Sequence, residues 1–301
     1  MSERPLHEGK LDRAQTLSNV RSKATYEAIS INPVTPVIGV EVEGVDMTSD
    51  VPDAQIEELS QALANHNVLF FRDQPELTAE QQIAFAKRFG ELHIHPARDR
   101  NGLEGHPEIL YLNAGPETSR VNGDEWHSDV SCDEEPPLGS ILRLFEVPSN
   151  GGDTLFSSMY AAYDALSEAM KELLGKLSAM HDGGPNYIDR AKRAGIYDPT
   201  KVFPANPHPI IRTHPETGRK AIFVNKIFTQ YIVDMPKDES RAILDFLFQH
   251  IAKPNFQCRF KWEKDSVAFW DNRCALHHAM WDYYPETRRG YRVTIKGDKP
   301  R

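Results

Sequence analysis

The 301-residue chain has few cysteines, no long hydrophobic run and no block of basic residues. Its three cysteines are widely spaced and form no CxxC pair, which argues against a disulfide scaffold and favours a reducing, cytoplasmic location. No apolar run approaches the roughly 18 residues that a membrane-spanning helix needs. Lys and Arg number 35 against 44 Asp and Glu, so the net charge is −9, and we expect neither nucleic acid nor membrane as a partner.

The composition is that of a globular protein, with 40% hydrophobic and 26% charged residues. Residues 1–24 show little periodicity, which predicts a flexible N-terminal arm, and they lack the apolar segment of a secretory signal. No linker divides the rest of the chain. We therefore expect a single domain over residues 25–301.

Short strand patterns outnumber helical ones along the chain. Hydrophobic periodicity predicts helices over residues 53–65 and 237–251. A capping box of Thr78 and Gln81 opens a further helix, which Gly90 ends. The strands do not alternate regularly with helices, so we expect a mainly β fold of the sandwich or jelly-roll type with helices flanking it. The predicted strands span residues 37–45, 68–71, 109–112, 140–147, 210–213, 221–224, 256–262, 266–270 and 290–296.

Residues 182–209 form a long segment with no clear pattern. The segment contains Gly183, Gly184 and five prolines. A loop of this length in a compact domain is usually a lid, a binding loop or a disordered insert. We interpret it as a loop, with closure over an active site as the hypothesis for its role.

The strongest local signal for chemistry is the sequence WHSD at residues 126–129. In an extended segment, side chains two residues apart point the same way, so His127 and Asp129 would present an imidazole and a carboxylate together. A histidine from a distant strand would complete the two-histidine, one-carboxylate set of non-haem Fe(II) oxygenases. His277 and His278 are both candidates for that position. A zinc hydrolase could use the same three groups to activate a water.

Two arginines share one face of the predicted C-terminal strand. In the sequence RRGYRVTI at residues 288–295, Arg288 and Arg292 lie four residues apart. Unpaired buried charge is costly, and guanidinium suits bidentate contacts with carboxylates and sulfonates. The two arginines therefore bind anionic ligands or pair with structural carboxylates such as Asp271 or Asp282. A separate turn, NGGDT at residues 150–154, would deliver the hydroxyl of Thr154 at the start of a strand.

These motifs together resemble those of the taurine dioxygenase family of Fe(II)- and 2-oxoglutarate-dependent dioxygenases. The resemblance runs from about residue 26 to residue 300, and it implies a double-stranded β-helix core of the jelly-roll or cupin-like type. The matching motifs, in the order and spacing of the family, are RFGELHIHP (88–96), WHSD (126–129), GGDT (151–154), WDNR (270–273) and RRGYRVTIKGDKP (288–300).

The resemblance implies a metal centre and a reaction. His127, Asp129 and His277 match the iron ligands, whereas His278 falls where the family usually has a residue that is not a ligand. The implied cofactors are Fe(II), 2-oxoglutarate as cosubstrate, and O2. The implied reaction decarboxylates 2-oxoglutarate to succinate and CO2 and hydroxylates a substrate carbon.

The resemblance also implies how two acids are held beside the metal. Arg288 matches the arginine that binds the distal carboxylate of 2-oxoglutarate, and Thr154 matches the hydroxyl that assists it. Arg292 and His95 match the residues that grip the sulfonate of the substrate. We interpret His93, the other histidine of the HxH pair, as structural. The residues assigned to the walls of the substrate pocket are Phe228 and Val130.

Two positions depart from the family pattern. The taurine enzymes carry a Tyr and an Asn near the substrate, where this chain has Arg98 and Gly123. The loss of a phenol and an amide weakens the binding of taurine's ammonium end, while Arg98 either favours a second anionic group or faces solvent.

We expect a small anionic organic substrate. The first choice is a sulfonate such as taurine, cleaved to sulfite and an aldehyde in sulfur metabolism. The alternatives within the family are a phenoxyalkanoate or an alkyl sulfate. Members of the family are often homo-oligomers, and the sequence places no interface.

Overall fold

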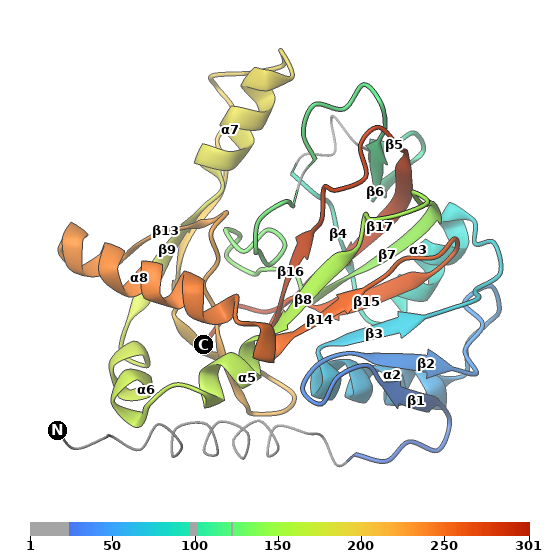
Figure 1. The fold of residues 1–301 in the computed structure, drawn as a ribbon, viewed down its shortest axis with the longest axis horizontal. Helices are drawn as coiled ribbons and strands as arrows, with labels where there is room; N and C mark the ends of the chain where they lie inside the picture. Colours follow the sequence, from blue (N-terminus) through green and yellow to red (C-terminus); the bar gives the residue numbers. More distant parts are fainter. Residues whose placement is uncertain (1–23, 97–101, 122) are drawn as a thin grey trace, which may run out of the picture.

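A large mixed sheet and a smaller antiparallel sheet face each other at the centre of the molecule (Figure 1). The structure is a computed structural model that describes residues 24–96, 102–121 and 123–301. Residues 1–23 of the predicted arm, and Arg98, lie outside the described residues. None of the described helices is long and apolar enough to cross a membrane.

The large sheet has the strand order β1-β2-β3-β15-β7-β17-β6-β5, with β4 paired to β17. β2 and β3 run parallel, and the other pairs are antiparallel. Its strands are β1 (Ser30–Pro33), β2 (Val40–Glu43), β3 (Val68–Phe71), β4 (Leu92–His93), β5 (Gly102–Leu103), β6 (His106–Ala114), β7 (Gly139–Glu146), β15 (Val267–Asp271) and β17 (Arg288–Ile295).

The small sheet consists of β14 (Gln257–Phe260), β8 (Thr154–Ser158) and β16 (Ala275–Ala279), in the order β14-β8-β16. Aromatic rings fill the space between the two sheets. Phe70 of β3 stacks on Phe260 of β14, with ring centroids 4.0 Å apart. This pair of facing sheets is the predicted jelly-roll core. The turn at residues 272–274 carries the chain from β15 in the large sheet to β16 in the small one, so residues near this turn meet side chains from both sheets.

Two helices cover the outer face of the large sheet. These are α2 (Asp53–His66) and α3 (Ala79–Lys87), and their apolar stripes pack against side chains of β3 and β15 in a second hydrophobic cluster. The capping box of Thr78 and Gln81 is present as predicted, with each side chain bonded to the other's backbone N–H. The sequence located both helices because stripe and cap are local patterns.

The prediction of a loop over residues 182–209 is wrong. The segment contains helix α7 (Gly184–Arg193), which lies between strands β9 (Ser178–Asp182) and β10 (Ala205–Pro209) and stands away from the central sheets (Figure 1). β9 also pairs with β13 (Thr229–Ile232). We took the glycines and prolines of this segment as features of a loop, but Gly184 and Pro185 open α7, where a proline removes no helical hydrogen bond. Closure of this segment as a lid stays a prediction.

The remaining elements include one predicted helix and one predicted pair of strands. The predicted helix over residues 237–251 is confirmed as α8 (Lys237–Ile251), and the strands β11 (Ile211–Thr213) and β12 (Lys220–Ile222) form a hairpin near the predicted positions. The short helices α5 (Met159–Asp164) and α6 (Glu168–Leu174) were not predicted. Four of the six residues of α5 are buried, so it lacks an amphipathic pattern. A 3-10 turn, η1 (Pro254–Phe256), leads into β14.

Candidate active site

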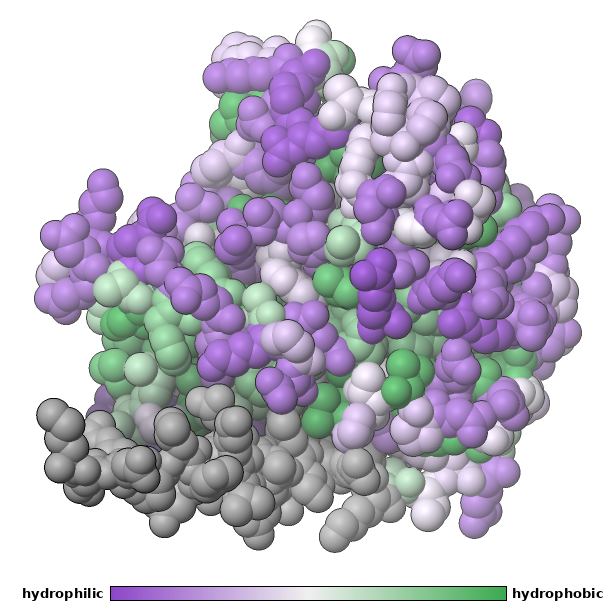
Figure 2. All heavy atoms as spheres, in the orientation of Figure 1, coloured by the Kyte–Doolittle hydropathy of each residue, from purple (hydrophilic) through white to green (hydrophobic). Residues whose placement is uncertain are grey.

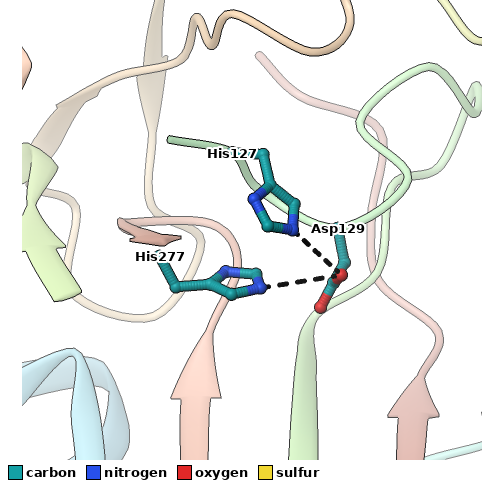
Figure 3. Close-up of side chains that lie close together, drawn as sticks. All are labelled: His127, Asp129 and His277. Carbon is teal, nitrogen blue, oxygen red and sulfur yellow. Dashed lines mark ion pairs between the residues drawn. The ribbon is translucent and has the colours of Figure 1, made fainter. Parts of the chain in front are cut away.

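Two imidazoles and one carboxylate converge where the sequence predicted a metal centre (Figure 3). His127 Nε2 lies 3.9 Å from Asp129 Oδ1, and His277 Nε2 lies 3.8 Å from the same oxygen. The three ligand atoms are all within 4.8 Å of one another, and all three residues are buried. These distances exceed a hydrogen bond and bring the three atoms near enough to bind one ion between them.

The backbones of the two histidines hold their rings side by side. His127 and His277 form an isolated antiparallel bridge, in which each N–H donates to the other's carbonyl, at 3.0 and 2.8 Å. Their ring centroids are 4.0 Å apart. His278 is the next residue on β16 and packs its ring against Trp126, outside the cluster. Between the two candidates for the third position, the geometry favours His277.

Asp129 does not lie in an extended strand, as the two-residue spacing had suggested. It sits in a turn in which Val130 adopts a φ of 46°. The WDNR turn anchors this segment. Ser128 Oγ donates to the Asn272 carbonyl at 2.9 Å, and the Asp129 N–H donates to Asn272 Oδ1 at 3.2 Å. The same amide oxygen accepts a bond from the indole N–H of Trp270 at 3.0 Å. Two motifs 143 residues apart therefore fix the carboxylate.

The protonation states of the cluster suit metal binding. His127 Nδ1 lies 2.8 Å from the Glu125 carbonyl, so its proton is on Nδ1 and the lone pair of Nε2 faces Asp129. Burial lowers the pKa of both His127 and His277, so both rings are neutral. Burial by itself would raise the pKa of Asp129. The charge of Arg292 and the hydrogen bond from Ser140 outweigh burial and hold that pKa below its ordinary value, so the carboxyl is ionised.

Arg292 of β17 binds the carboxylate of the cluster itself. Its Nη1 donates to Asp129 Oδ1 at 2.6 Å, while Ser140 Oγ donates to Oδ2 at 2.8 Å. The sequence had offered Asp271 or Asp282 as a structural partner, and Arg292 pairs with neither. Its Nε is buried and has no hydrogen-bond partner among the described residues. Arg292 thus keeps one buried donor for a ligand next to Asp129.

Arg288 is buried, and no carboxylate of the described residues forms an ion pair with it. Its Nε donates to the Gly152 carbonyl at 3.0 Å and its Nη2 to Thr154 Oγ1 at 3.4 Å, while the Trp262 indole donates to the same hydroxyl at 3.0 Å. No ion pair reaches its guanidinium within the part of the chain that the structure describes. Burial lowers its pKa to about 10. A buried cation without a counter-ion is matched by a carboxylate-bearing ligand.

The GGDT turn brings the backbone close to Arg288. Gly152 has a φ of +69°, and a Cβ there would lie 2.9 Å from Pro148 Cγ and 3.3 Å from Arg288 Cδ. Glycine is therefore required both by the backbone conformation and by the close approach. Thr154 follows as the first residue of β8, as the sequence predicted.

The residues predicted for the substrate surround a small hydrophobic cluster next to Asp129. Val130 and Phe228 belong to this cluster, and it also contains Cys132 and Tyr187. The ring of His95 lies T-shaped to the ring of Tyr187, with centroids 6.2 Å apart. Sequence reasoning missed Tyr187, because it falls in the segment interpreted as a loop. The spacing of three residues between Tyr187 and Arg190, which is typical of one face of a helix, is the signal that could have revealed it.

Arg292 and His95 lie within electrostatic reach of each other. Burial lowers the pKa of His95, and the charge of Arg292 lowers it further, so the ring is neutral.

His93, interpreted as structural, lies with its Nε2 2.7 Å from Asp133 Oδ2. Gly123, at one of the positions that depart from the family, has a φ of +87°, and a Cβ there would lie 3.0 Å from His127 Cε1. The absence of a side chain at Gly123 lets the His127 ring approach the backbone more closely than a larger residue would allow.

The chain is similar to known proteins both in sequence and in structure. A sequence model described as "Taurine catabolism dioxygenase TauD, TfdA family" matches residues 30–294. A putative alpha-ketoglutarate-dependent sulfonate dioxygenase of Schizosaccharomyces pombe is 37% identical over 270 residues, which are 87% of this chain and 68% of the relative. An alpha-ketoglutarate-dependent sulfate ester dioxygenase of Pseudomonas putida is 35% identical over 282 residues, 90% of this chain and 91% of the relative. The crystal structure of a putative alpha-ketoglutarate-dependent taurine dioxygenase from Burkholderia xenovorans superposes with a TM-score of 0.79 at 36% identity, covering 90% of this chain and 94% of that one.

Proposed function

Because the chain belongs to the TauD, TfdA family and is a 2-oxoglutarate-dependent (alpha-ketoglutarate-dependent) dioxygenase, we propose that it hydroxylates a small organic sulfonate such as taurine. The observation that carries this proposal is the convergence of two neutral imidazoles and an ionised carboxylate at one buried point. Arg288 and Arg292 are also buried, and their two positive charges would bind the two separate acids, the cosubstrate and the substrate.

The donor set fits Fe(II). His127, Asp129 and His277 would hold the ion as two neutral nitrogen ligands and one carboxylate oxygen, the set typical of non-haem Fe(II) oxygenases. The bond from His127 Nδ1 to the Glu125 carbonyl keeps the Nε2 lone pair directed at the ion. Bound there, Fe(II) supplies the redox chemistry that couples decarboxylation of 2-oxoglutarate to hydroxylation of a C–H bond by O2.

Arg288 and Thr154 would bind the distal carboxylate of 2-oxoglutarate. The guanidinium is already oriented by the Gly152 carbonyl and by the Thr154 hydroxyl, so little ordering remains when the carboxylate arrives. Trp262 holds the hydroxyl from the other side. The work of these residues is to supply a fixed positive charge that matches one end of the cosubstrate.

Arg292 and His95 would bind the sulfonate, with Phe228 and Val130 against the carbon chain. Because Arg292 also binds Asp129, an anion held by its remaining donors lies next to the metal ligands. That arrangement fixes one C–H bond of the substrate at the reactive position. Hydroxylation of a carbon that bears a sulfonate gives a product that collapses to an aldehyde and sulfite.

A substrate panel tests the proposal. The wild-type protein is incubated under air with Fe(II), 2-oxoglutarate and a sulfonate, an alkyl sulfate or a phenoxy acid, and succinate is measured together with sulfite, sulfate or phenol. We expect succinate and sulfite with the sulfonate. Succinate formed only with the phenoxy acid, together with phenol, would replace the sulfonate by the runner-up substrate class. Substrate cleavage that does not depend on 2-oxoglutarate would favour a zinc hydrolase instead.

A further inference from the structure

Helix α7 turns one aromatic side chain toward the candidate active site. Of its ten residues only Tyr187 is buried, with 4% of its surface exposed. The surface over the hairpin around α7 is mostly hydrophilic (Figure 2). The Tyr187 ring packs in one cluster with Val130 and Phe228 and lies T-shaped to His95. Tyr187 therefore neighbours three of the four residues proposed to hold the substrate.

The hydroxyl of Tyr187 is buried and has no hydrogen-bond partner among the described residues. Burial is the main cause that raises the pKa of this phenol, and the Asp129 carboxylate acts in the same direction. The phenol therefore keeps its proton, can donate a hydrogen bond, and lies within electrostatic reach of Asp129. A buried donor without a partner costs free energy, and few such groups persist in folded proteins.

The position of the Tyr187 ring is fixed by a missing side chain. A Cβ at Gly183 would lie 2.9 Å from Cδ2 and Cε2 of Tyr187 and 2.9 Å from the Cys132 sulfur. The ring thus occupies space that any larger residue at position 183 would take. The Tyr187 N–H donates to the Gly183 carbonyl at 2.9 Å and fixes the first turn of the helix. The hydroxyl is held in place before any ligand arrives, which reduces the entropy lost on binding.

A second side chain of α7 faces the same way. Arg190 follows Tyr187 by three residues and so lies on the same face of the helix. Its charge contributes to the lowered pKa of both His95 and His127, which places it within electrostatic reach of the cluster. The inner face of α7 therefore presents a phenol and a positive charge toward the region that contains Asp129.

We propose that Tyr187 is a specificity-determining residue, whose hydroxyl donates a hydrogen bond to an oxygen of the substrate's sulfo group. A sulfo group presents three oxygens in a tetrahedral arrangement, and Arg292 Nε, His95 and the Tyr187 hydroxyl supply three donors. A carboxylate presents only two oxygens in one plane, so it leaves the third donor without an oxygen of its own. The inference rests on the proposed function and extends it to sulfonates and sulfate esters as one class.

Replacing Tyr187 by phenylalanine tests the inference, because it removes the hydroxyl and keeps the ring. With the sulfonate or sulfate ester that the panel identifies, we expect Tyr187→Phe to raise the KM about ten- to a hundredfold, the range for a lost hydrogen bond to a charged group. The KM for 2-oxoglutarate should change little, since Arg288 is untouched. Calorimetric titration of the same substrate into protein loaded with Mn(II) and 2-oxoglutarate, without O2, should show the same loss of affinity.

Thermal unfolding separates a binding role from a structural one. Tyr187→Phe removes a buried hydroxyl that has no hydrogen-bond partner among the residues that the structure describes, so the variant should unfold at the same temperature as the wild type or higher. Tyr197→Phe is the matched control. Tyr197 lies just beyond α7, is 44% exposed and packs under the Lys192 ammonium, and its variant should keep the wild-type KM and melting temperature.

Two results would overturn the inference. If Tyr187→Phe retained the wild-type KM and affinity for the sulfo substrate, or melted well below the wild type, the hydroxyl would serve the fold rather than the ligand. Both results leave wild-type turnover of the sulfo substrate intact, so the proposed function would survive them. If the wild type itself formed no succinate with any sulfonate or sulfate ester, the proposed function and this inference would fail together.

Discussion

Two buried clusters in this molecule have nearly the same composition. Each contains a histidine and an aspartate, and in each the possible ligand atoms lie within 4.8 Å of one another. By composition and distance alone, both are candidate metal sites. The first cluster consists of His127, Asp129 and His277, and the second cluster consists of His214, Asp271 and Cys274.

In the second cluster, the histidine and the aspartate already form hydrogen bonds with other groups of the protein. His214 Nδ1 accepts bonds from two backbone N–H groups, so its proton is on Nε2, which donates to Asp271 Oδ2 at 3.0 Å. Arg273 binds the same carboxylate through two side-chain nitrogens, at 2.9 and 2.6 Å. Burial raises the pKa of the Cys274 thiol, which therefore keeps its proton. A metal ion would have to displace an arginine and two protons to bind here.

The first cluster differs in the direction of its hydrogen bonds. His127 Nδ1 donates its proton to the Glu125 carbonyl, so the free lone pair of Nε2 faces Asp129. The second cluster supports the first. Asp271 lies next to Asn272, which binds the Ser128 hydroxyl and the Asp129 N–H. Whether such a cluster can bind a metal therefore depends on which lone pairs and protons are already used in hydrogen bonds, and not on the residue types alone.

The largest expected effect comes from breaking the first cluster. His277→Ala removes one of the three proposed metal ligands, and we expect it to abolish 2-oxoglutarate-dependent succinate formation. We also expect added Mn(II) to raise the melting temperature of the wild type and to leave that of His277→Ala unchanged. The control is His278→Ala, which changes the adjacent residue outside the cluster and should keep both properties. Activity retained by His277→Ala and lost by His278→Ala would assign the third ligand to the rival histidine.

Breaking the second cluster should cost stability instead. Asp271→Asn leaves the buried Arg273 without its main counter-ion, and loss of one partner from a buried pair lowers the free energy of unfolding by about 3–5 kcal/mol. Denaturant unfolding measures this loss. Glu216→Gln, at the half-exposed second partner of Arg273, should lower it by less than about 1 kcal/mol. Equal stability of Asp271→Asn and wild type would remove the structural interpretation of the second cluster.

Arg273 and Arg288 differ in the same way as the two clusters, because only one of them has its ionic partner within the described part of the protein. Arg273 has its carboxylate within the protein, whereas Arg288 has none among the described residues. Arg288→Met should therefore raise the KM for 2-oxoglutarate about ten- to a hundredfold, since a charge-assisted hydrogen bond contributes about 1.5–3 kcal/mol. The KM for the sulfo substrate should change less. The neighbouring Arg289, which pairs with Glu146 near the surface, provides the control variant Arg289→Met.

Local patterns in the sequence predicted much of this. Hydrophobic periodicity located α2 and α8, the capping box located the start of α3, and the alternation in RRGYRVTI placed Arg288 and Arg292 on one buried face. Residue types and their spacing also picked out His127 and Asp129, whereas His277 and His278 stayed alternatives until the resemblance to the family favoured His277. The helices, the cap and the alternation along the strand depend on contacts between residues close together in the chain.

Pairings between distant residues were beyond the sequence. Arg292 binds Asp129 across 163 positions, and His214 binds Asp271 across 57, so neither bond leaves a periodic trace. Tyr187 was missed for another reason. We interpreted the glycines and proline that precede it as loop residues, and the same residues can begin a helix. The sequence alone could not decide between these two uses.

The smallest expected effect separates the two clusters most cleanly. Cys274→Ala removes a possible ligand from the second cluster, and because that cluster is structural we expect the free energy of unfolding to fall by only about 1 kcal/mol. The rise in melting temperature with Mn(II) or Zn(II) should be unchanged. Cys258→Ala removes an equally buried sulfur that belongs to neither cluster, and should behave alike. A response to Zn(II) that Cys274→Ala loses and Cys258→Ala keeps would show that an ion does displace Arg273, and that saturation by hydrogen bonds does not exclude a metal.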